Sequence, residues 1–225
     1  MMNSLYQSVA DLVIRIAELG GPVVLLLIVL SVLTLTVILY KLWQFRAAGV
    51  GRHKALRLAV SAWDAGDTGT ARSELAQSKS YLKPVIAMAF AGRCDQARLD
   101  AEAETRFARL ESGFRFLDSV AQLSPLLGLF GTVLGMISAF QALQEAGAQV
   151  DPSILAGGIW VALLTTAVGL AVAMPTSIVL SWFETRMEKE RVLAEKALRS
   201  VQSPAGGMPP QETAVQAPAG APAHA

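Results

Sequence analysis

Two threonines, Thr132 and Thr166, are the residues of this 225-residue chain whose placement best suits chemistry. Each lies near the middle of an apolar stretch, residues 123–140 and 157–181, and a hydroxyl both donates and accepts hydrogen bonds. With their flanks, both stretches are long enough to cross a bilayer. If they form antiparallel neighbouring helices, the two hydroxyls meet at about the same depth. A single threonine in a membrane helix more often bonds its own backbone carbonyl, so the functional interpretation depends on the pair, and Thr165 is the weaker candidate.

Small residues recur at helical spacing along each stretch. Residues three or four positions apart lie on one side of a helix. Helices in lipid associate through close packing and polar contacts, which small residues permit. The two small-residue faces are Ser124, Gly128, Thr132, Gly135 and Ala139 in the first stretch, and Gly158, Ala162, Thr166, Gly169, Ala173 and Ser177 in the second. Of these, Gly128, Gly135, Gly158 and Gly169 are the glycines of the predicted helix-packing face.

Ionisable side chains are absent from the interior of both stretches and of a third apolar run, residues 23–40. Ionisable groups inside a membrane mark proton relays and ion pathways. The chain offers hydroxyls near the middle of the bilayer but no titrating carboxylate. A proton pathway built on this chain must therefore take its titrating group from another subunit.

Other function classes find no support in the sequence. The nucleophile-elbow, phosphate-loop and zinc-protease motifs are all missing, and the glycines of residues 128–135 lack both the lysine and the preceding strand of a nucleotide loop. Cys94 is a single cysteine, and the two histidines are far apart in the sequence. We therefore expect no catalytic site, no metal and no cofactor. The net charge of +1 gives no reason to expect nucleic acid as a partner.

The composition, 53% hydrophobic and 16% charged, is that of a membrane protein, because soluble domains carry about 25% charged residues. We predict an all-α integral membrane protein whose three transmembrane helices extend into a cytoplasmic helical region. The predicted parts are an amphipathic periplasmic helix (1–19), transmembrane helix 1 (20–44), a cytoplasmic helical region (45–115), transmembrane helix 2 (116–143), a periplasmic loop (144–152), transmembrane helix 3 (153–182), its cytoplasmic extension (183–202) and a disordered tail (203–225).

The charges that flank the three spans predict the topology. Basic residues follow the first span from Arg46 onward and follow the third span from Arg186 onward, whereas the loop at 144–152 carries only acids. The positive-inside rule then places the amino terminus outside and the carboxyl terminus in the cytoplasm. Lys41, with Trp43 and Arg46, is interpreted as an interfacial anchor. No break is predicted between residues 100–113 and the second span, which favours one long helix there.

Two segments give the chain a resemblance to a known family. SPLLGLFGTVLGMISAF and the later AGGIWVALLTTAVGLAVAMP resemble the second and third membrane helices of the MotA/TolQ/ExbB proton-channel family, over about residues 116–175. The three-helix layout is similar to its ExbB and TolQ branch. The resemblance implies a stator-like proton-channel subunit in the bacterial inner membrane, which couples the proton motive force to TonB- or Tol-dependent work at the outer membrane. Thr132 and Thr166 match the family threonines that line the proton path.

The resemblance also implies partners. They are a single-helix ExbD- or TolR-like protein carrying an intramembrane aspartate, a TonB- or TolA-like protein, further copies of this chain (five by family expectation) and the lipid bilayer. One departure from the family is Val161, which stands where many members have a glutamate. This departure keeps an alternative open, a non-conducting oligomeric membrane scaffold that uses the small-residue faces only for packing.

Overall fold

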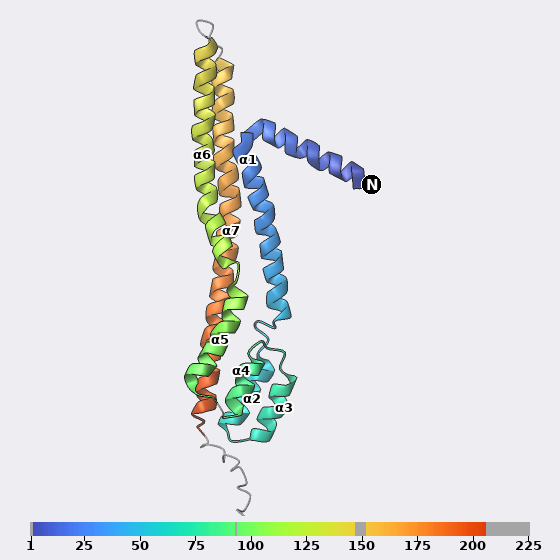
Figure 1. Cartoon of the computed structure of the whole chain (residues 1–225), viewed down its shortest axis with the longest axis vertical. Coiled ribbons are helices and arrows are strands. Elements are labelled where there is room, and N and C mark those ends of the chain that lie inside the picture. Colours follow the sequence, from blue (N-terminus) through green and yellow to red (C-terminus); the bar gives the residue numbers. More distant parts are fainter. Residues whose placement is uncertain (1, 93, 147–151, 206–225) are drawn as a thin grey trace, which may run out of the picture. The chain divides into compact units, whose positions relative to one another are not determined.

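The computed structural model describes residues 2–92, 94–146 and 152–205, and each element within these ranges is an α-helix (Figure 1). Three segments, Gly21–Ala47, Phe114–Glu145 and Leu155–Gln202, are long and apolar enough to cross a membrane. The predicted all-α class with three transmembrane helices is confirmed. The helices are α1 (Met2–Ala47), α2 (Lys54–Asp64), α3 (Thr68–Gln77), α4 (Lys83–Phe90), α5 (Gln96–Glu111), α6 (Phe114–Ala146) and α7 (Pro152–Gln202).

The chain divides into two compact units, which are described separately. The membrane unit consists of residues up to 47 together with 107–191, and the second unit consists of residues 48–106 and the chain from 192 onward. The predicted loop at 144–152 falls mostly, and the predicted tail almost wholly, outside the described residues.

The first helix bends where the membrane span begins. Gly21 has φ 67° and ψ −172°, a conformation that glycine adopts without steric cost, and it separates α1 into the two legs seen in Figure 1. Pro22 follows directly and suits the first turn of the second leg, because its missing N–H would have no helical partner there. Only the backbone of residues 2–20 is described, so the amphipathic character of the first leg stays a prediction.

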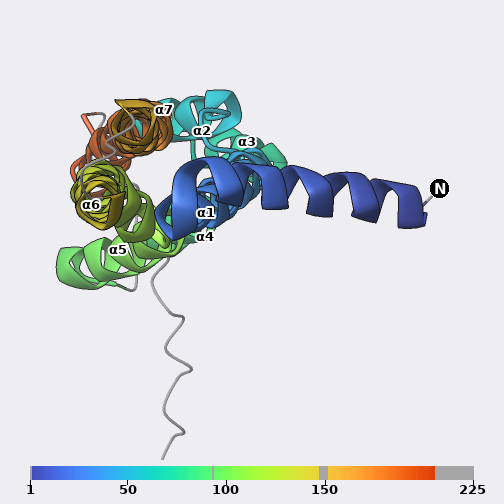
Figure 2. The ribbon, with the colours of Figure 1, turned by 90° about the horizontal axis from the view of Figure 1, so that it is seen from above.

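α6 and α7 are antiparallel neighbours whose backbones come into contact (Figures 1 and 2). A β-carbon placed on Gly128 would lie 3.0 Å from the carbonyl oxygen of Thr165 and 3.1 Å from the α-carbon of Thr166. One placed on Gly169 would lie 2.6 Å from the carbonyl oxygen of Ser124. The distance at Gly169 is shorter than a β-carbon tolerates, and those at Gly128 are tighter than most β-carbon contacts, so glycine at both positions permits this close separation of the helices.

The same contact continues toward the other end of the two helices. A β-carbon on Gly135 would lie 3.3 Å from that of Ala162, and one on Gly158 would collide with the β-carbon of Ala139. The four glycines of the predicted packing face thus all lie between α6 and α7. We call this contact, with Gly128, Gly135, Gly158 and Gly169 along it, the glycine seam.

One buried stripe of α1 faces inward and includes two polar residues. Leu27, Thr34 and Lys41 follow one another at intervals of seven residues, and each is at most 3% exposed. Residues seven apart lie on nearly the same side of a helix, so these side chains form one line along α1. α1 packs against α6 along this span.

Lys41 closes this stripe, and its predicted role as an interfacial anchor is wrong. Its Nζ donates to Gln44 Oε1 at 2.7 Å, to Ser112 Oγ at 3.1 Å and to the carbonyl oxygen of Leu110 at 3.2 Å. An ammonium group has three N–H donors, and all three are used here. The cation is therefore held by the turn between α5 and α6, whereas Trp43 is 66% exposed.

The helix predicted to run without a break into the second span is interrupted at residues 112 and 113. Gly113 has φ 91°, which glycine adopts freely and other residues rarely do. The hydroxyl of Ser112 donates to the carbonyl oxygen of Arg109 at the end of α5. The sequence indicates this break only by a single glycine. Because a helix tolerates one glycine at small cost, the sequence pattern alone does not predict that the helix is interrupted there.

Aromatic rings pack beside this turn in the membrane unit. Phe183 of α7 lies edge-on to Phe45 at a centroid distance of 5.2 Å and stacks on Phe114 at 5.6 Å. Arg191 forms a two-oxygen ion pair with Glu111 and also lies over an aromatic ring, that of Phe107. These contacts join the end of α1, the start of α6 and the later part of α7.

The second unit is a small helical bundle with its own apolar core. Trp63 stacks on Phe90 with ring centroids 4.2 Å apart, and its indole N–H donates to the carbonyl oxygen of Val201. Asp67 caps α3, and its hydrogen bonds with Thr70 lower the pKa of its carboxyl. Other buried residues of this core are Leu56, Ala59, Leu75, Leu82, Val85, Ile86, Leu99, Ala103 and Leu198.

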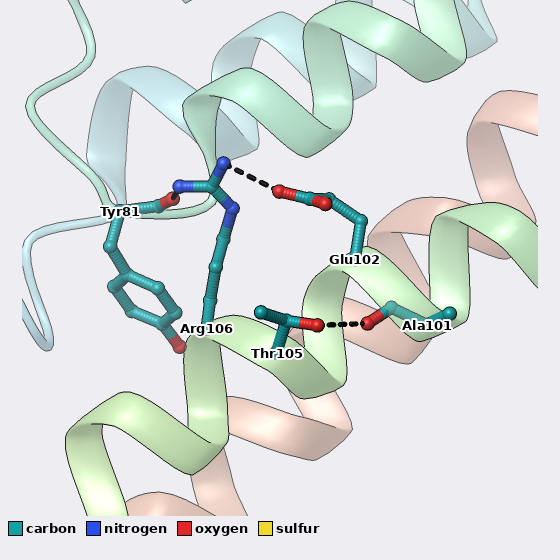
Figure 3. Close-up of polar contacts among 5 residues, drawn as sticks. All are labelled: Tyr81, Ala101, Glu102, Thr105 and Arg106. Atoms are coloured by element: carbon teal, nitrogen blue, oxygen red, sulfur yellow. Dashed lines mark hydrogen bonds and ion pairs between the residues drawn. The ribbon is translucent and has the colours of Figure 1, made fainter.

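An arginine ties α5 to the loop before α4 (Figure 3). Arg106 donates to the carbonyl oxygen of Tyr81 at 3.3 Å and pairs with Glu102 one turn back on α5 at 2.8 Å. The loop residue Tyr81 in turn donates its backbone N–H to the carbonyl oxygen of Ala48. The loop is thereby fixed on both sides.

The turn at Gly113 gives a first prediction. Replacing Gly113 with alanine should lower the free energy of unfolding by about 1–2 kcal/mol, the cost of a left-handed conformation for a residue with a β-carbon. Gly69→Ala, an exposed change inside α3, is the control and should not lower stability. Thermal unfolding of both purified variants in detergent tests this. Equal unfolding midpoints for the two variants would contradict the assignment.

The glycine seam gives a second prediction, for which two adjacent residues serve as test and control. Gly158→Val places new atoms against Ala139 and should cost about 1–3 kcal/mol, as overpacking does. Gly157→Val adds the same atoms where nothing lies within 4 Å and should leave the thermal unfolding midpoint nearly unchanged. If Gly157→Val proved as destabilising as Gly158→Val, the seam would not be what holds α6 to α7.

Candidate functional site

Hydroxyl groups gather beside the glycine seam, and that of Thr165 lies inside the contact. It is 1% exposed, and its Oγ1 lies 2.7 Å from the carbonyl oxygen of Ala162 and 3.2 Å from that of Gly128. Its single proton is thus shared between its own helix and α6. Thr165 lies three residues after Ala162 and seven after Gly158, so the three residues share one side of the helix. This spacing is the sequence feature that indicates a position for Thr165 inside the seam.

Thr166 lies at the edge of the seam. The residue is half-buried, and its Oγ1 is 3.5 Å from the carbonyl oxygen of Gly128, at the outer limit of a hydrogen bond. A hydroxyl held so weakly can turn toward another acceptor or donor at little cost. Of the two adjacent threonines, Thr165 is committed to the seam and Thr166 is the one available to a partner.

Thr132 is half-buried on α6 and bonds to its own helix. Its Oγ1 donates to the carbonyl oxygen of Leu129 at 2.6 Å, which is the local bond expected of a threonine in a membrane helix. The hydroxyl oxygen keeps lone pairs that can accept a further hydrogen bond.

The register of α6 and α7 sets the relative depth of the two predicted threonines. Gly135 faces Ala162 and Gly128 faces Thr166, so Thr132 lies at a level between these two pairs. With a rise of about 1.5 Å per residue, Thr132 and Thr166 are separated by less than about one helical turn along the helix axes. The structure thus brings the two residues to similar depth, with no hydrogen bond between them.

Buried hydroxyls that were not predicted as site residues include those of Ser124, a member of the predicted small-residue face, and of Thr34. Ser124 is fully buried and donates to the carbonyl oxygen of Val120 at 2.7 Å. Thr34, in the middle of the first span, is 3% exposed and its Oγ1 has no hydrogen-bond partner among the described residues. With Lys41 predicted to be an interfacial anchor, its spacing of seven residues from Thr34 does not by itself indicate that the two share a buried stripe.

A pocket of about 440 Å³ opens in the membrane unit beside the bend of α1, between α1, α6 and α7. Its lining includes Gly21, Ser138, Val161 and Thr165, and it is mostly apolar. Val161 therefore places an apolar side chain at a position that faces this pocket. Among the described residues that line it, the side-chain polar groups are the hydroxyls of Ser138 and Thr165.

The chemistry available to these residues is hydrogen bonding without titration. Residues 19–40, 119–144 and 152–183 contain no acidic or basic side chain. Within the described ranges, no group of three or more His, Cys, Asp or Glu could hold a metal ion. The seam can therefore donate hydrogen bonds to a charged group of a partner and accept them from it, but it cannot itself take up a proton.

Comparisons with known proteins agree with this arrangement. The pattern of the MotA/TolQ/ExbB proton channel family matches residues 77–196, more than half of the chain and including α6 and most of α7. Among curated proteins, the biopolymer transport protein exbB1 of Vibrio cholerae is 45% identical over 67 residues, 30% of this chain and 29% of that protein. The putative biopolymer transport protein ExbB-like 1 of Synechocystis is 30% identical over 162 residues, 69% of this chain and 64% of that protein.

A third relative comes from another branch of the same family. The Tol-Pal system protein TolQ of Pseudomonas aeruginosa is 40% identical over 80 residues, 36% of this chain and 34% of that protein. The matches thus span between about a third and two thirds of the length of these curated relatives. With three membrane-spanning helices and a match over more than half of its length, this chain belongs to the MotA/TolQ/ExbB proton channel family.

Proposed function

We propose that this chain is the proton-channel subunit of a bacterial inner-membrane complex that couples the proton motive force to TonB- or Tol-dependent work at the outer membrane. The observation that carries the proposal is the pair of half-buried hydroxyls, Thr132 and Thr166, at similar depth in spans that hold no ionisable side chain. Polar groups of this kind suit a charged partner better than a lipid tail. Relatives named for biopolymer transport and for the Tol-Pal system support the same function.

The proposed mechanism assigns the titrating group to the partner. A single-helix protein of the ExbD or TolR type carries an intramembrane aspartate, and copies of this chain surround it as a homo-oligomer. Thr132 and Thr166 hydrogen-bond the carboxylate while it takes up and releases a proton. Each proton that crosses about 100 mV releases about 2.3 kcal/mol, so several protons drive substantial movement of the partner and of a TonB- or TolA-like protein.

The proposed topology places the amino terminus in the periplasm and the carboxyl terminus in the cytoplasm. Five cations and no acid occur from residue 19 to residue 63, and α7 ends in a strongly charged segment rich in Lys and Arg. Between the two later spans the sequence carries Glu145, at the end of α6, and Asp151, and no Lys or Arg. This difference in the number of Lys and Arg residues favours a periplasmic location for the α6–α7 connection.

A second candidate function is a non-conducting oligomeric membrane scaffold. Val161 favours it, because the side chain on that wall of the pocket is apolar, whereas the family resemblance implies a glutamate at this position in many members. In this case the glycine seam serves packing alone. The two functions differ in proton flux, which the scaffold lacks.

The third prediction concerns the two hydroxyls. In the complex purified from native membranes and placed in liposomes, Thr132→Ala with Thr166→Ala should lower proton flux about ten- to a hundredfold, because a hydrogen bond to a charged group contributes about 1.5–3 kcal/mol. Serine at both positions keeps the hydroxyls and should restore most of the flux. Thr36→Ala is the matched control, since Thr36 is exposed and bonds only its own helix.

The outcomes of this experiment separate the candidates. Undiminished flux in the double alanine variant, with assembly intact, would refute the assignment of the two threonines. Absence of flux in the unaltered complex would refute the channel function and favour the scaffold.

The fourth prediction concerns the partner. Affinity purification of the tagged chain from its native membranes should recover a small protein with one membrane helix and an aspartate near its start. Mass spectrometry identifies it. Recovery of this chain alone, in a detergent that preserves other membrane complexes, would contradict the proposal that a partner protein supplies the titrating carboxylate.

A further inference from the structure

An open, basic pocket of about 450 Å³ lies at the start of α2 in the second unit. Its lining residues are Gly51, His53, Lys54, Arg57, Leu58 and Ser61. The side chains of Lys54 and Arg57 are exposed, and neither forms a hydrogen bond or ion pair with another residue in the described part of the chain. Two cations three positions apart on a helix point to the same side, so both can approach one anion.

The walls of this pocket are built and held in place. His53 is 4% exposed, its Nε2 accepts the backbone N–H of Gly51 at 3.1 Å, and its Nδ1 lies 3.1 Å from Ser80 Oγ. The loop containing Ser80 is fixed in turn, through Tyr81, to Ala48 and to Arg106 of α5 (Figure 3). The basic pocket therefore has a rigid backbone frame, whereas its two cations project freely from it.

The charges around the pocket favour an anion. Within the second unit, residues 48–63 carry Arg52, Lys54 and Arg57 and no acidic residue. Acids return only at Asp64, at the far end of α2 from Lys54. The Ser61 hydroxyl on the lining can donate to a phosphate oxygen as well.

The residues around the two cations favour a lipid as the source of the anion. Leu58 borders them with 47% of its surface exposed, which suits an amphiphile better than a soluble ion. The membrane-spanning helix ends at Ala47, and the seven residues from there to Lys54 extend at most about 25 Å. A lipid is therefore the anion that both the exposed leucine and the short connection to the membrane-spanning helix favour.

We propose that the basic pocket binds the phosphate of an anionic phospholipid between Lys54 and Arg57, with Leu58 against the lipid's apolar part. The site would tie the second unit to the bilayer surface. The proposed lipid site needs only a bilayer that contains anionic lipid, so the proposal does not depend on proton conduction by this chain.

Native mass spectrometry of the full chain in detergent tests the proposal, with phosphatidylglycerol and phosphatidylethanolamine added at equal concentration. We expect phosphatidylglycerol to be retained preferentially. Lys54→Gln with Arg57→Gln should weaken its binding by about thirtyfold, since each cation near an anionic surface contributes roughly one factor of five. Arg72→Gln with Arg98→Gln is the control, because it removes two exposed cations of the same unit outside the pocket.

Each alternative outcome counts against the site. Equal retention of the two lipids, or equal losses in test and control variants, would show that the attraction is general and would overturn the proposal. Displacement of the lipid by millimolar inorganic phosphate would identify a soluble-anion site instead. Unaltered lipid binding with loss of a co-purified acidic protein in the Lys54→Gln, Arg57→Gln variant would reassign the pocket to a protein partner.

Discussion

The backbone contact between α6 and α7 is the constraint on which the rest of the membrane unit depends. Lipid tails are as apolar as leucine side chains, so two helices in a bilayer gain little from burying apolar surface against each other. Their association must come from close packing and from polar contacts, and both need small residues. The glycine seam supplies the packing and Thr165 supplies a hydrogen bond across it. The relative positions of Thr132 and Thr166 follow from this register.

Two classes of polar group in the membrane unit differ in how many of their hydrogen bonds are already made within the unit. Lys41 and Ser124 have their donors used within the unit, and Thr165 shares its proton between two carbonyl oxygens. Thr166 is held only weakly at the seam edge. Groups of the first class fix the helices, because breaking their bonds would leave buried polar atoms unpaired. The second class is free to serve a partner, which the proposed channel requires.

Much of the architecture was predictable from sequence, because long uncharged runs have only one stable location. The three spans and the all-α class follow from residues such as 23–40, where no side chain is charged. The packing face containing Gly128 and Gly158 follows from helical spacing. The break at Gly113 and the buried state of Lys41 were not predictable, since a glycine inside a helix and a lysine at its end have several compatible environments.

The sequence by itself determined that this chain enters a membrane three times and carries no titrating group there, because both properties are set by residue type along the chain. Only the tertiary structure decided which hydroxyls form hydrogen bonds inside the membrane unit and which are held weakly. Thr165 and Thr166 are adjacent and identical in type, yet one lies inside the seam and the other at its edge. Successive residues of α7 are rotated by about 100° around the helix axis. Because α6 packs against one side of α7, this rotation places Thr165 inside the contact and Thr166 at its edge.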